Sequence, residues 1–468
     1  MDYKETFTGL VFSILLIFTN SCSSGVKKAT DSPPEKTLVS GKIDEKVTCS
    51  ENPEFTYSLY LPSKAIPGTS QTWPVIIAFD PHGSGLTPVR KYRELAEKCG
   101  YILAGSNNSK NGQTASETEN IVHSLILDFL SRYPIDTNRI YVAGFSGGSR
   151  VASLAALTHK EIKGVIGCGA GFPGWNQLPA QKFDYFGCVG LADFNLNEMV
   201  RLDTSLQKMH FRHCLVTFDG PHEWPPMEIM EKGFLWLSFN AMKDGRIKKD
   251  DLLIGSIKTK MAKLATNQME EKNRLESAGF LEYGLNCLEG LANVTSIEKV
   301  LVELKQNPGY RRQLKHRKNL LIKEQMEQKM MTDQLFVKDK KWWKNQIGKY
   351  KSTGNSSDDV EENMKNKRLL SFLRLVCYSN ARAALNQNNI ALSFRIIDIY
   401  ELSDPMNPEP DYLRSILFMR EQDTVSSMAQ LQKALDKGFS DKVRIIQQNE
   451  FQGLKDYRPY FDLLQKIK

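Results

Sequence analysis

One serine in this 468-residue chain stands in a setting that could make it a nucleophile. Ser146 is the centre of a G-x-S-x-G motif at residues 144–148, between an apolar run at 139–143 and the helix-compatible segment SRVASLAAL. The two glycines permit a sharp, strained turn that lifts the hydroxyl above a sheet, and the following helix directs its amides toward it. The motif alone arises by chance, but its place between a strand and a helix predicts an activated serine.

A serine nucleophile at neutral pH needs a base, and the base needs a carboxylate that holds it in the right tautomer. Of the seven histidines, His222 follows the last predicted strand in the rigid turn DGPHEWPP, where it can fold back over the sheet. Asp193 begins the loop after another predicted strand, whereas Asp219 is too close to His222 in sequence and Asp184 precedes its strand. We therefore predict Ser146, Asp193 and His222 as the catalytic residues.

A glycine-rich loop at residues 80–85 (DPHGSG) follows the apolar run at 73–79. We expect an amide of Gly83 or Ser84, together with that of Gly147, to bind a developing oxyanion. His82 is interpreted as a residue that braces the loop. The cysteines and histidines lack the spacing of a metal site, and we expect neither a metal nor a cofactor.

Polar and aromatic residues near these loops are candidates for the substrate site. Such residues are also common as loop braces and packed aromatics, so the type alone is not diagnostic. The predicted substrate-binding residues are Asn108, Trp175 and Trp224, with Asn107 and Phe172 beside them.

The elements that must position these residues alternate from residue 41 to about 244. Apolar runs predict strands, and a helix over 117–132 carries its apolar residues at helical spacing and is closed by Pro134. This rhythm predicts an α/β fold with a mainly parallel sheet. The predicted strands cover residues 56–61, 73–79, 101–104, 139–143, 164–168, 185–189 and 214–218.

The segments FDPHGSG, PIDTNRIYVAGFSGGSR, GLADFN and GPHEWPP, with the order serine, aspartate, histidine, resemble the α/β-hydrolase superfamily. The resemblance is to its esterase branch of feruloyl-esterase, polyhydroxybutyrate-depolymerase and phospholipase/carboxylesterase types, and it covers about residues 41–244. It implies a serine hydrolase that cleaves carboxylic esters, small or polymer-linked, through an acyl-enzyme at Ser146. It does not specify the substrate.

The first forty residues predict export. Residues 9–18 (GLVFSILLIF) are too few to span a bilayer but suit the apolar part of a signal peptide. The next residues, TNSCSS, resemble a bacterial lipoprotein signal, in which the cysteine, here Cys22, receives the lipid. We expect a signal peptide at 1–21, a tether at 22–40, and an exported lipoprotein anchored in the bacterial cell envelope, in the periplasm or outer membrane.

Beyond residue 244 the pattern changes to long helical stretches. Residues 245–368 are predicted only as helical, whereas 369–468 resemble tetratricopeptide repeats. A 34-residue offset there aligns small or apolar residues, and stacked repeats of this kind leave a concave surface for a protein partner, which we expect here. The aligned pairs are Ala381 with Ser415, Ser393 with Ser427, and Ile397 with Leu431.

The net charge of +8 is concentrated in one segment. Residues 305–351 hold 14 lysines and arginines against four acidic residues, but no nucleic-acid motif accompanies them. We interpret the segment as a solvated helical face and expect no nucleic-acid partner.

Two alternatives to an esterase stay open. One is a serine peptidase of the same fold, although such enzymes usually carry the catalytic domain after a β-propeller and this sequence has no blade repeats. The other is a cell-envelope interaction protein that uses the helical repeats and does not need catalysis.

Overall fold

The computed structural model describes residues 39–65, 70–172, 182–267, 274–356 and 359–467. The predicted signal peptide, Cys22 and Trp175 lie outside these residues. The chain from Val39 onward forms one compact unit. No helix within the described ranges is long and apolar enough to cross a membrane.

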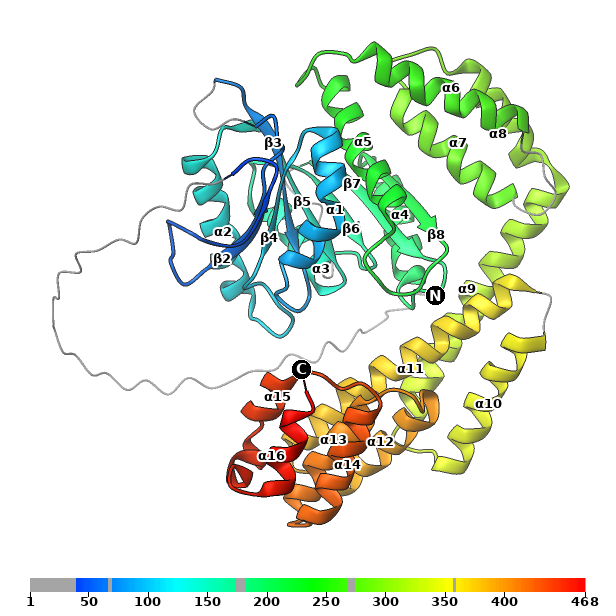
Figure 1. The fold of residues 1–468 in the computed structure, drawn as a ribbon. Helices are drawn as coiled ribbons and strands as arrows, with labels where there is room; N and C mark the ends of the chain where they lie inside the picture. Colours follow the sequence, from blue (N-terminus) through cyan, green and yellow to red (C-terminus); the bar gives the residue numbers. More distant parts are fainter. Residues whose placement is uncertain (1–38, 66–69, 173–181, 268–273, 357–358, 468) are drawn as a thin grey trace, which may run out of the picture. The chain divides into compact units, whose positions relative to one another are not determined.

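An eight-stranded sheet forms the centre of the first half of the chain, with the order β1-β2-β4-β3-β5-β6-β7-β8 (Figure 1). Strands β3 to β8 pair in parallel, and β2 pairs antiparallel with both β1 and β4. The strands are β1 (Ile43–Thr48), β2 (Thr56–Tyr60), β3 (Trp73–Phe79), β4 (Ile102–Ser106), β5 (Ile135–Phe145), β6 (Ile162–Cys168), β7 (Asp184–Gly190) and β8 (His213–Phe218).

All seven predicted strands are present within a few residues of their expected limits. Residues of β3, β4 and β7 are buried throughout, as expected for parallel strands covered on both faces. The strand that the sequence did not predict is β1, whose residues IDEKVT are mostly polar and partly exposed at the sheet edge. Its composition lacks the apolar run that identified the others.

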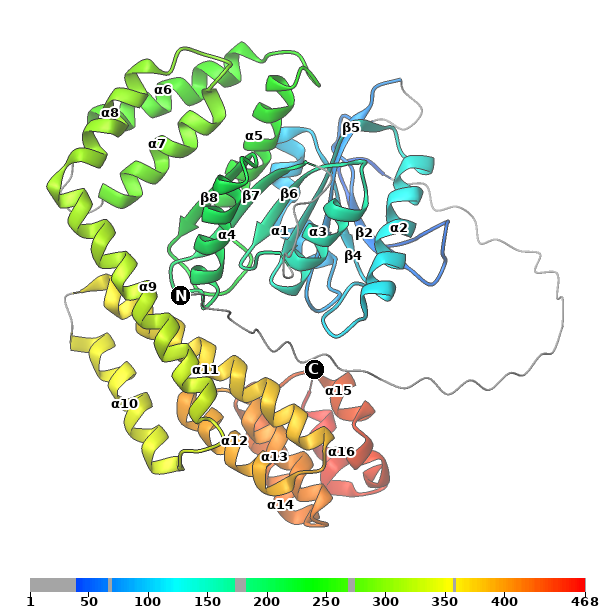
Figure 2. The ribbon, with the colours of Figure 1, turned by 180° about the vertical axis from the view of Figure 1, so that it is seen from behind.

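Helices cover both faces of the sheet. Helices α1 (Leu86–Cys99) and α5 (Met227–Lys243) pack together on one face, and α2 (Ala115–Arg132) and α3 (Gly147–Thr158) lie on the other (Figure 2). Helix α4 (Leu196–Lys208) follows β7 and contacts β7 and β8. This is the α/β arrangement with a mainly parallel sheet that the sequence predicts, and the parallel strands β3 to β8 all end at one edge of the sheet.

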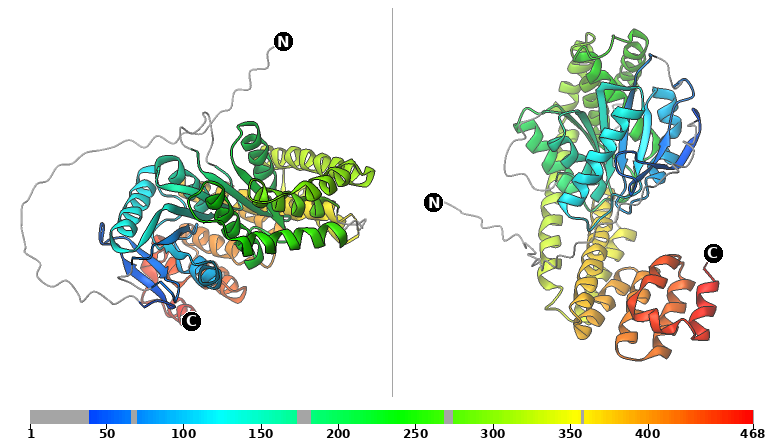
Figure 3. Two further views of the ribbon diagram at one scale, coloured as in Figure 1. Left: turned by 90° about the horizontal axis from the view of Figure 1, so that it is seen from above. Right: turned by 90° about the vertical axis from the view of Figure 1, so that its left-hand side faces the viewer.

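The second half of the chain consists of helices joined by turns and short loops in its described residues, as predicted. Two helix pairs, α11 with α12 and α13 with α14, pack side by side (Figure 3). The helices are α6 (Asp251–Asn267), α7 (Arg274–Leu288), α8 (Thr295–Gln306), α9 (Pro308–Gln334), α10 (Lys340–Ser356), α11 (Val360–Asn386), α12 (Ile390–Ser403), α13 (Glu409–Arg420), α14 (Thr424–Asp436), α15 (Lys442–Gln447) and α16 (Arg458–Gln465), with a 3₁₀ turn at Asn449–Leu454.

The 34-residue offset has a physical basis in these pairs. All six residues that it aligns are fully buried, and they lie on helices that pack in the pairs α11 with α12 and α13 with α14. Small buried residues allow close helix packing, which is how stacked helical repeats are built. Membership of the tetratricopeptide class stays a prediction.

The described residues form two large hydrophobic clusters, and the change from one to the other occurs along α9. Side chains of α6, α7 and α8 belong to the same hydrophobic cluster as the sheet and α5, and this cluster extends to Tyr310. A second cluster begins with Met331 and Leu335 near the end of α9 and includes the helices that follow. The secondary-structure change near residue 245 therefore does not coincide with a boundary between cores.

Candidate active site

Ser146 stands in the turn between β5 and α3, with a strained backbone (φ 53°, ψ −118°). A positive φ is unusual for a residue with a side chain, and its cost is borne by the packing around the turn. A Cβ on Gly144 would come within 2.0 Å of the Gly148 carbonyl oxygen, and one on Gly148 within 2.0 Å of the Phe79 carbonyl oxygen. Both glycines of the motif are therefore required by close backbone contacts.

The structure brings Ser146, His222 and Asp193 together in one hydrogen-bonded chain. The Oγ of Ser146 lies 2.9 Å from Nε2 of His222, and Nδ1 of His222 lies 2.8 Å from Oδ2 of Asp193. An ionised carboxylate only accepts hydrogen bonds, so Nδ1 carries the ring proton and Nε2 is left to accept the serine proton. This is the geometry that nucleophile activation requires.

The side chains of Asp193 and His222 differ in their exposure to solvent. The Asp193 side chain is 1% exposed and its Oδ1 accepts the Asn195 amide at 2.8 Å, whereas the His222 side chain is 18% exposed. The imidazole contacts the rings of Phe145 and Phe194, with centroids 4.6 and 4.3 Å away. The carboxylate is thus held in the interior, and the more exposed imidazole packs against two aromatic rings with its Nε2 toward Ser146.

Asp80, at the start of the predicted oxyanion loop, joins that loop to the loop of His222. Its carboxylate accepts the Trp224 indole N–H at 2.8 Å and the His82 amide at 2.9 Å. Burial alone would raise the pKa of Asp80, but the hydrogen bonds from His82 and Trp224 outweigh it and lower that pKa. The hydrogen bond with Asp80 in turn raises the pKa of the exposed His82 side chain.

The predicted oxyanion residues are placed differently from one another. Gly147 is the first residue of α3, directly after Ser146. The amide of Gly83 donates to the Asp80 carbonyl at 3.1 Å, so an oxyanion role for it would require this turn to open. Ser84 shares a hydrogen bond between its hydroxyl and that of Thr87, 2.8 Å apart, and is exposed. The second oxyanion amide stays a prediction.

The residues predicted to line the substrate site mostly have other partners. The Asn108 side chain accepts from the Thr56 amide at 2.7 Å and donates to the Glu54 carbonyl at 3.3 Å, which ties its loop to β2. Trp224 is buried against Tyr92 and Phe145. The polar groups of both side chains are thus engaged within the fold, and a role for Asn108 and Trp224 at the substrate site stays a prediction.

Asn107 is likewise bound to the backbone of Glu45 through its amide nitrogen, at 3.2 Å. Phe172 is buried and packs against Phe183 and Tyr185, with centroids 5.9 and 4.9 Å away. Trp175 is outside the described residues.

Two residues at the site were missed by sequence reasoning. Gly169 has a φ of 64°, and a Cβ on it would lie 2.9 Å from Oδ2 of Asp193 and 3.2 Å from Nδ1 of His222. The side-chain oxygen of Asn111 lies so close to Gly147 that a Cβ there would be 1.7 Å from it. No local motif marks either residue, because each comes close to the site residues only when the sheet has folded.

Comparison with known proteins gives similarity to solved structures of hydrolases. An S-formylglutathione hydrolase from Staphylococcus aureus is 13% identical, with a TM-score of 0.33, over 39% of this chain and 92% of that chain. A ferulic acid esterase is 16% identical, with a TM-score of 0.33, over 42% and 95%. An S-formylglutathione hydrolase from Agrobacterium tumefaciens is 16% identical, with a TM-score of 0.32, over 39% and 89%. No family model and no curated protein matches the chain.

Proposed function

We propose that this protein is a serine ester hydrolase that cleaves carboxylic esters through an acyl-enzyme at Ser146. The observation that carries the proposal is the chain of two hydrogen bonds, 2.9 and 2.8 Å long, from Ser146 through His222 to the buried Asp193. The strained turn that presents Ser146 at the start of α3 supports it.

In the proposed reaction the Ser146 Oγ attacks the ester carbonyl carbon while its proton passes to Nε2 of His222. The Asp193 carboxylate stabilises the imidazolium that forms, and the Gly147 amide donates to the oxyanion. The carbon–oxygen bond to the alcohol then breaks, and His222 returns the proton to the departing alkoxide. Water attacks the acyl-enzyme by the same route, with His222 as base, and releases the carboxylic acid and free Ser146.

The test combines a fluorophosphonate probe, read by intact mass, with a panel of short-chain aryl esters and aryl-amide peptides. We expect one covalent adduct on the wild-type protein, no adduct on Ser146→Ala, and hydrolysis of the esters but not of the peptides. Faster peptide cleavage would favour the peptidase alternative. A folded Ser146→Ala protein that hydrolyses esters at the wild-type rate would overturn the assignment.

Asp193→Asn provides a second test of the same mechanism. The amide can donate to Nδ1 and so favours the tautomer in which Nε2 cannot accept the serine proton, as in the trypsin precedent. We expect kcat to fall by about 10⁴-fold with the fold preserved, as judged by circular dichroism and unfolding. A loss below about tenfold would exclude Asp193 as the residue that orients His222.

We also propose that the chain is exported and carries lipid on Cys22. The support is the short apolar segment at 9–18 that ends near a cysteine preceded by a small residue. Metabolic labelling with a palmitate analogue should mark the wild-type protein and not Cys22→Ala. Label that survives this substitution would exclude the anchor.

A further inference from the structure

One face of α9 lies along the segment that carries Asp193. Leu321, Glu324 and Gln328 are three and four residues apart, so they share one face of the helix. The Leu321 carbonyl accepts from the Asn197 side chain at 2.8 Å, and the Gln328 side chain donates to the Phe194 carbonyl at 3.5 Å. The Leu321 side chain also packs in a small cluster with Val189, Leu196 and Met199.

Arg368 of α11 connects Glu324 with the same segment. Its Nε and Nη2 lie 2.9 and 2.7 Å from Oε2 of Glu324, and its Nη1 donates to the Leu191 carbonyl at 2.6 Å. The side chains are 2% and 0% exposed. The planar guanidinium can hold a carboxylate with one edge and direct a further N–H at a different acceptor, which a lysine cannot do.

Backbone connections link Leu191 both to Asp193 and to the turn that carries His222. It is two residues before Asp193, and its amide donates to the Phe218 carbonyl at 2.8 Å. The next residue, Ala192, donates to the Gly220 carbonyl at 2.9 Å, two residues before His222. A shift of the Leu191 peptide would therefore move the Asp193 carboxylate and disturb the turn that carries the imidazole.

The buried Arg368–Glu324 ion pair carries a desolvation cost that apolar side chains joining the same two helices would not carry. Burial raises the pKa of Glu324, and the Arg368 guanidinium only partly offsets this effect. The ionised pair is therefore formed at the cost of removing two charges from water. Replacing such a pair by apolar residues of similar volume is often neutral for stability. What two leucines could not supply is the directed hydrogen bond to the Leu191 carbonyl.

We propose that Arg368, held by Glu324, is a positioning residue for the proposed reaction: it fixes the Leu191–Asp193 segment so that the carboxylate meets Nδ1 of His222. The inference rests on the proposed function and gives the helical half of the chain a part in it. Arg368 acts through the backbone of the segment and touches neither substrate nor reacting atoms.

The test uses the full chain with three sets of substitutions. Arg368→Leu with Glu324→Leu removes the pair without leaving a buried unpaired charge. Arg368→Lys keeps the charge for Glu324 but loses the fork. The matched control is Arg420→Leu with Glu450→Leu: Arg420 also binds a glutamate, with Nε to Oε1 at 2.7 Å, and also donates to a backbone carbonyl, that of Leu385, away from the 191–197 segment.

Two measurements are made on each variant. One is kcat and KM for a short-chain aryl ester, and the other is the low-field NMR resonance of the proton between His222 Nδ1 and Asp193. We expect both Arg368 variants to lose about 10- to 100-fold in kcat, which is typical when the orientation of a catalytic group is relaxed, with KM little changed. The resonance should broaden or shift in these variants and stay unchanged in the control pair.

An unchanged resonance and kcat in the folded double variant would overturn the proposal. The same holds if the Arg420 control loses as much as the Arg368 variants, since the effect would then be one of general stability. If the double variant does not fold, Arg368→Lys decides by the same criteria. If the wild-type protein neither labels nor hydrolyses esters, the proposed function fails, whereas the resonance still decides whether Arg368 holds Asp193 against His222.

Discussion

Gly169 shows how closely the fold is built around Asp193 and His222. It follows β6, has a left-handed backbone (φ 64°), and leaves no room for a side chain beside the pair. Its carbonyl accepts the Asn195 side chain at 2.7 Å, so it also braces the segment that carries Asp193. The residue contributes by having no side chain where one would separate the two groups.

Gly169→Ala should therefore reduce kcat by about 10- to 100-fold, because the added methyl would displace the Asp193 carboxylate from His222. Gly245→Ala is the matched control, since Gly245 has a similar φ of 68° and nothing within 4 Å of an added Cβ. Both substitutions carry the left-handed backbone cost of roughly 1–2 kcal/mol in unfolding free energy. Steady-state kinetics should separate them, and equal kcat losses would contradict the steric argument.

The Asp80–Trp224 hydrogen bond predicts a pH-dependent contribution to stability. The pKa of Asp80 is lowered in the folded protein from an ordinary value of 3.8. Its stabilisation is therefore present above that value and is lost as the pH falls through the depressed pKa.

Trp224→Phe should lower the unfolding free energy near pH 7 by about 1.5–3 kcal/mol, the usual contribution of a hydrogen bond to a charged group. The difference from wild type should shrink as the pH falls below 3.8, in denaturant titrations at several pH values. Trp236→Phe is the control, because the buried Trp236 indole has no hydrogen-bond partner within the described ranges. A Trp224 difference that is as independent of pH as the Trp236 difference would exclude the carboxylate as its source.

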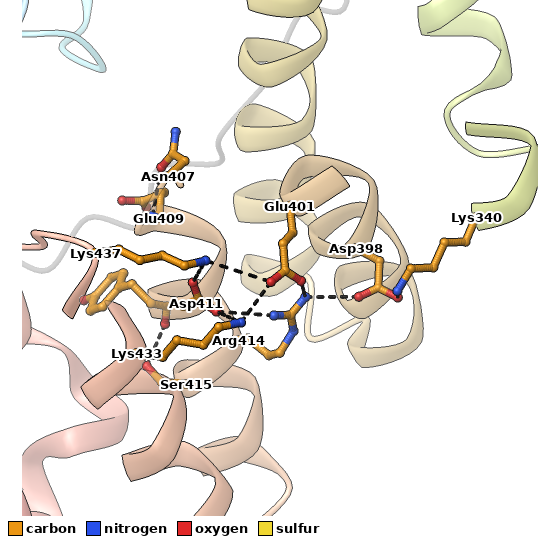
Figure 4. Close-up of polar contacts among 11 residues, drawn as sticks. Lys340, Asp398, Glu401, Asn407, Glu409, Asp411, Arg414, Ser415, Lys433 and Lys437 are labelled. Carbon is orange, nitrogen blue, oxygen red and sulfur yellow. Dashed lines mark hydrogen bonds and ion pairs between the residues drawn. The ribbon is translucent and has the colours of Figure 1, made fainter. Parts of the chain in front are cut away.

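Between elements, charged side chains link α13 with the C-terminal end of α14. Figure 4 shows Asp411 of α13 facing Lys433 of α14 and Lys437, which directly follows that helix, with Arg414 and Glu401 beside them. The Asp411 carboxylate is fully buried, 2.8 Å from Nζ of Lys433 and 2.5 Å from Nζ of Lys437. The buried Asp411 carboxylate thus pairs with two ammonium groups at the C-terminal end of α14, one of which, that of Lys433, also pairs with Glu401 at 2.9 Å.

Asp411→Ala should lower the unfolding free energy by about 3 kcal/mol, because it leaves the partly buried Lys437 without its nearest anion. Asp462→Ala, which removes an exposed carboxylate 3.8 Å from Arg458, should cost less than about 1 kcal/mol. Thermal unfolding followed by circular dichroism compares the two. Similar losses at both positions would mean that the Asp411 network adds little to stability.

At the scale of the whole molecule, the sheet depends on helices beyond its own fold. Helices α6, α7 and α8 share its hydrophobic cluster, and the Tyr283 hydroxyl donates to the Lys232 carbonyl of α5 at 3.0 Å. A chain that ends at Lys248 would expose the apolar surface that these helices cover.

The change of sequence pattern near residue 245 predicts that a chain ending at Lys248 folds by itself. The shared cluster leads us to expect the opposite: that chain should aggregate or unfold at lower denaturant, and one ending at Lys318, which keeps α6 to α8, should stay soluble. Size-exclusion chromatography and denaturant titration of both purified proteins test this. A monomeric Lys248 protein with the same unfolding midpoint as the Lys318 protein would show that the shared cluster contributes little.

The sequence predicted seven of the eight strands of the sheet and the three residues of the candidate site. Buried parallel strands are continuous apolar runs, and the G-x-S-x-G turn demands glycines, so both leave local patterns that can be recognised without a fold. The positions of Ser146, Asp193 and His222 after β5, β7 and β8 could also be predicted from the sequence, because parallel strands end at one edge of the sheet. Their catalytic roles stay a prediction that the proposed experiments test.

Only the tertiary structure decided which residues surround that site. It buried Trp224, tied Asn108 to β2, placed Gly169 against Asp193, and brought Arg368 to Leu191 from 177 residues away. These contacts depend on the directions of side chains and on the packing of helices that are distant from the sheet in sequence. Neither leaves a periodic pattern in the sequence. A local sequence pattern indicates the backbone conformation of its own segment. A contact between distant segments forms only when the chain has folded around its hydrophobic core.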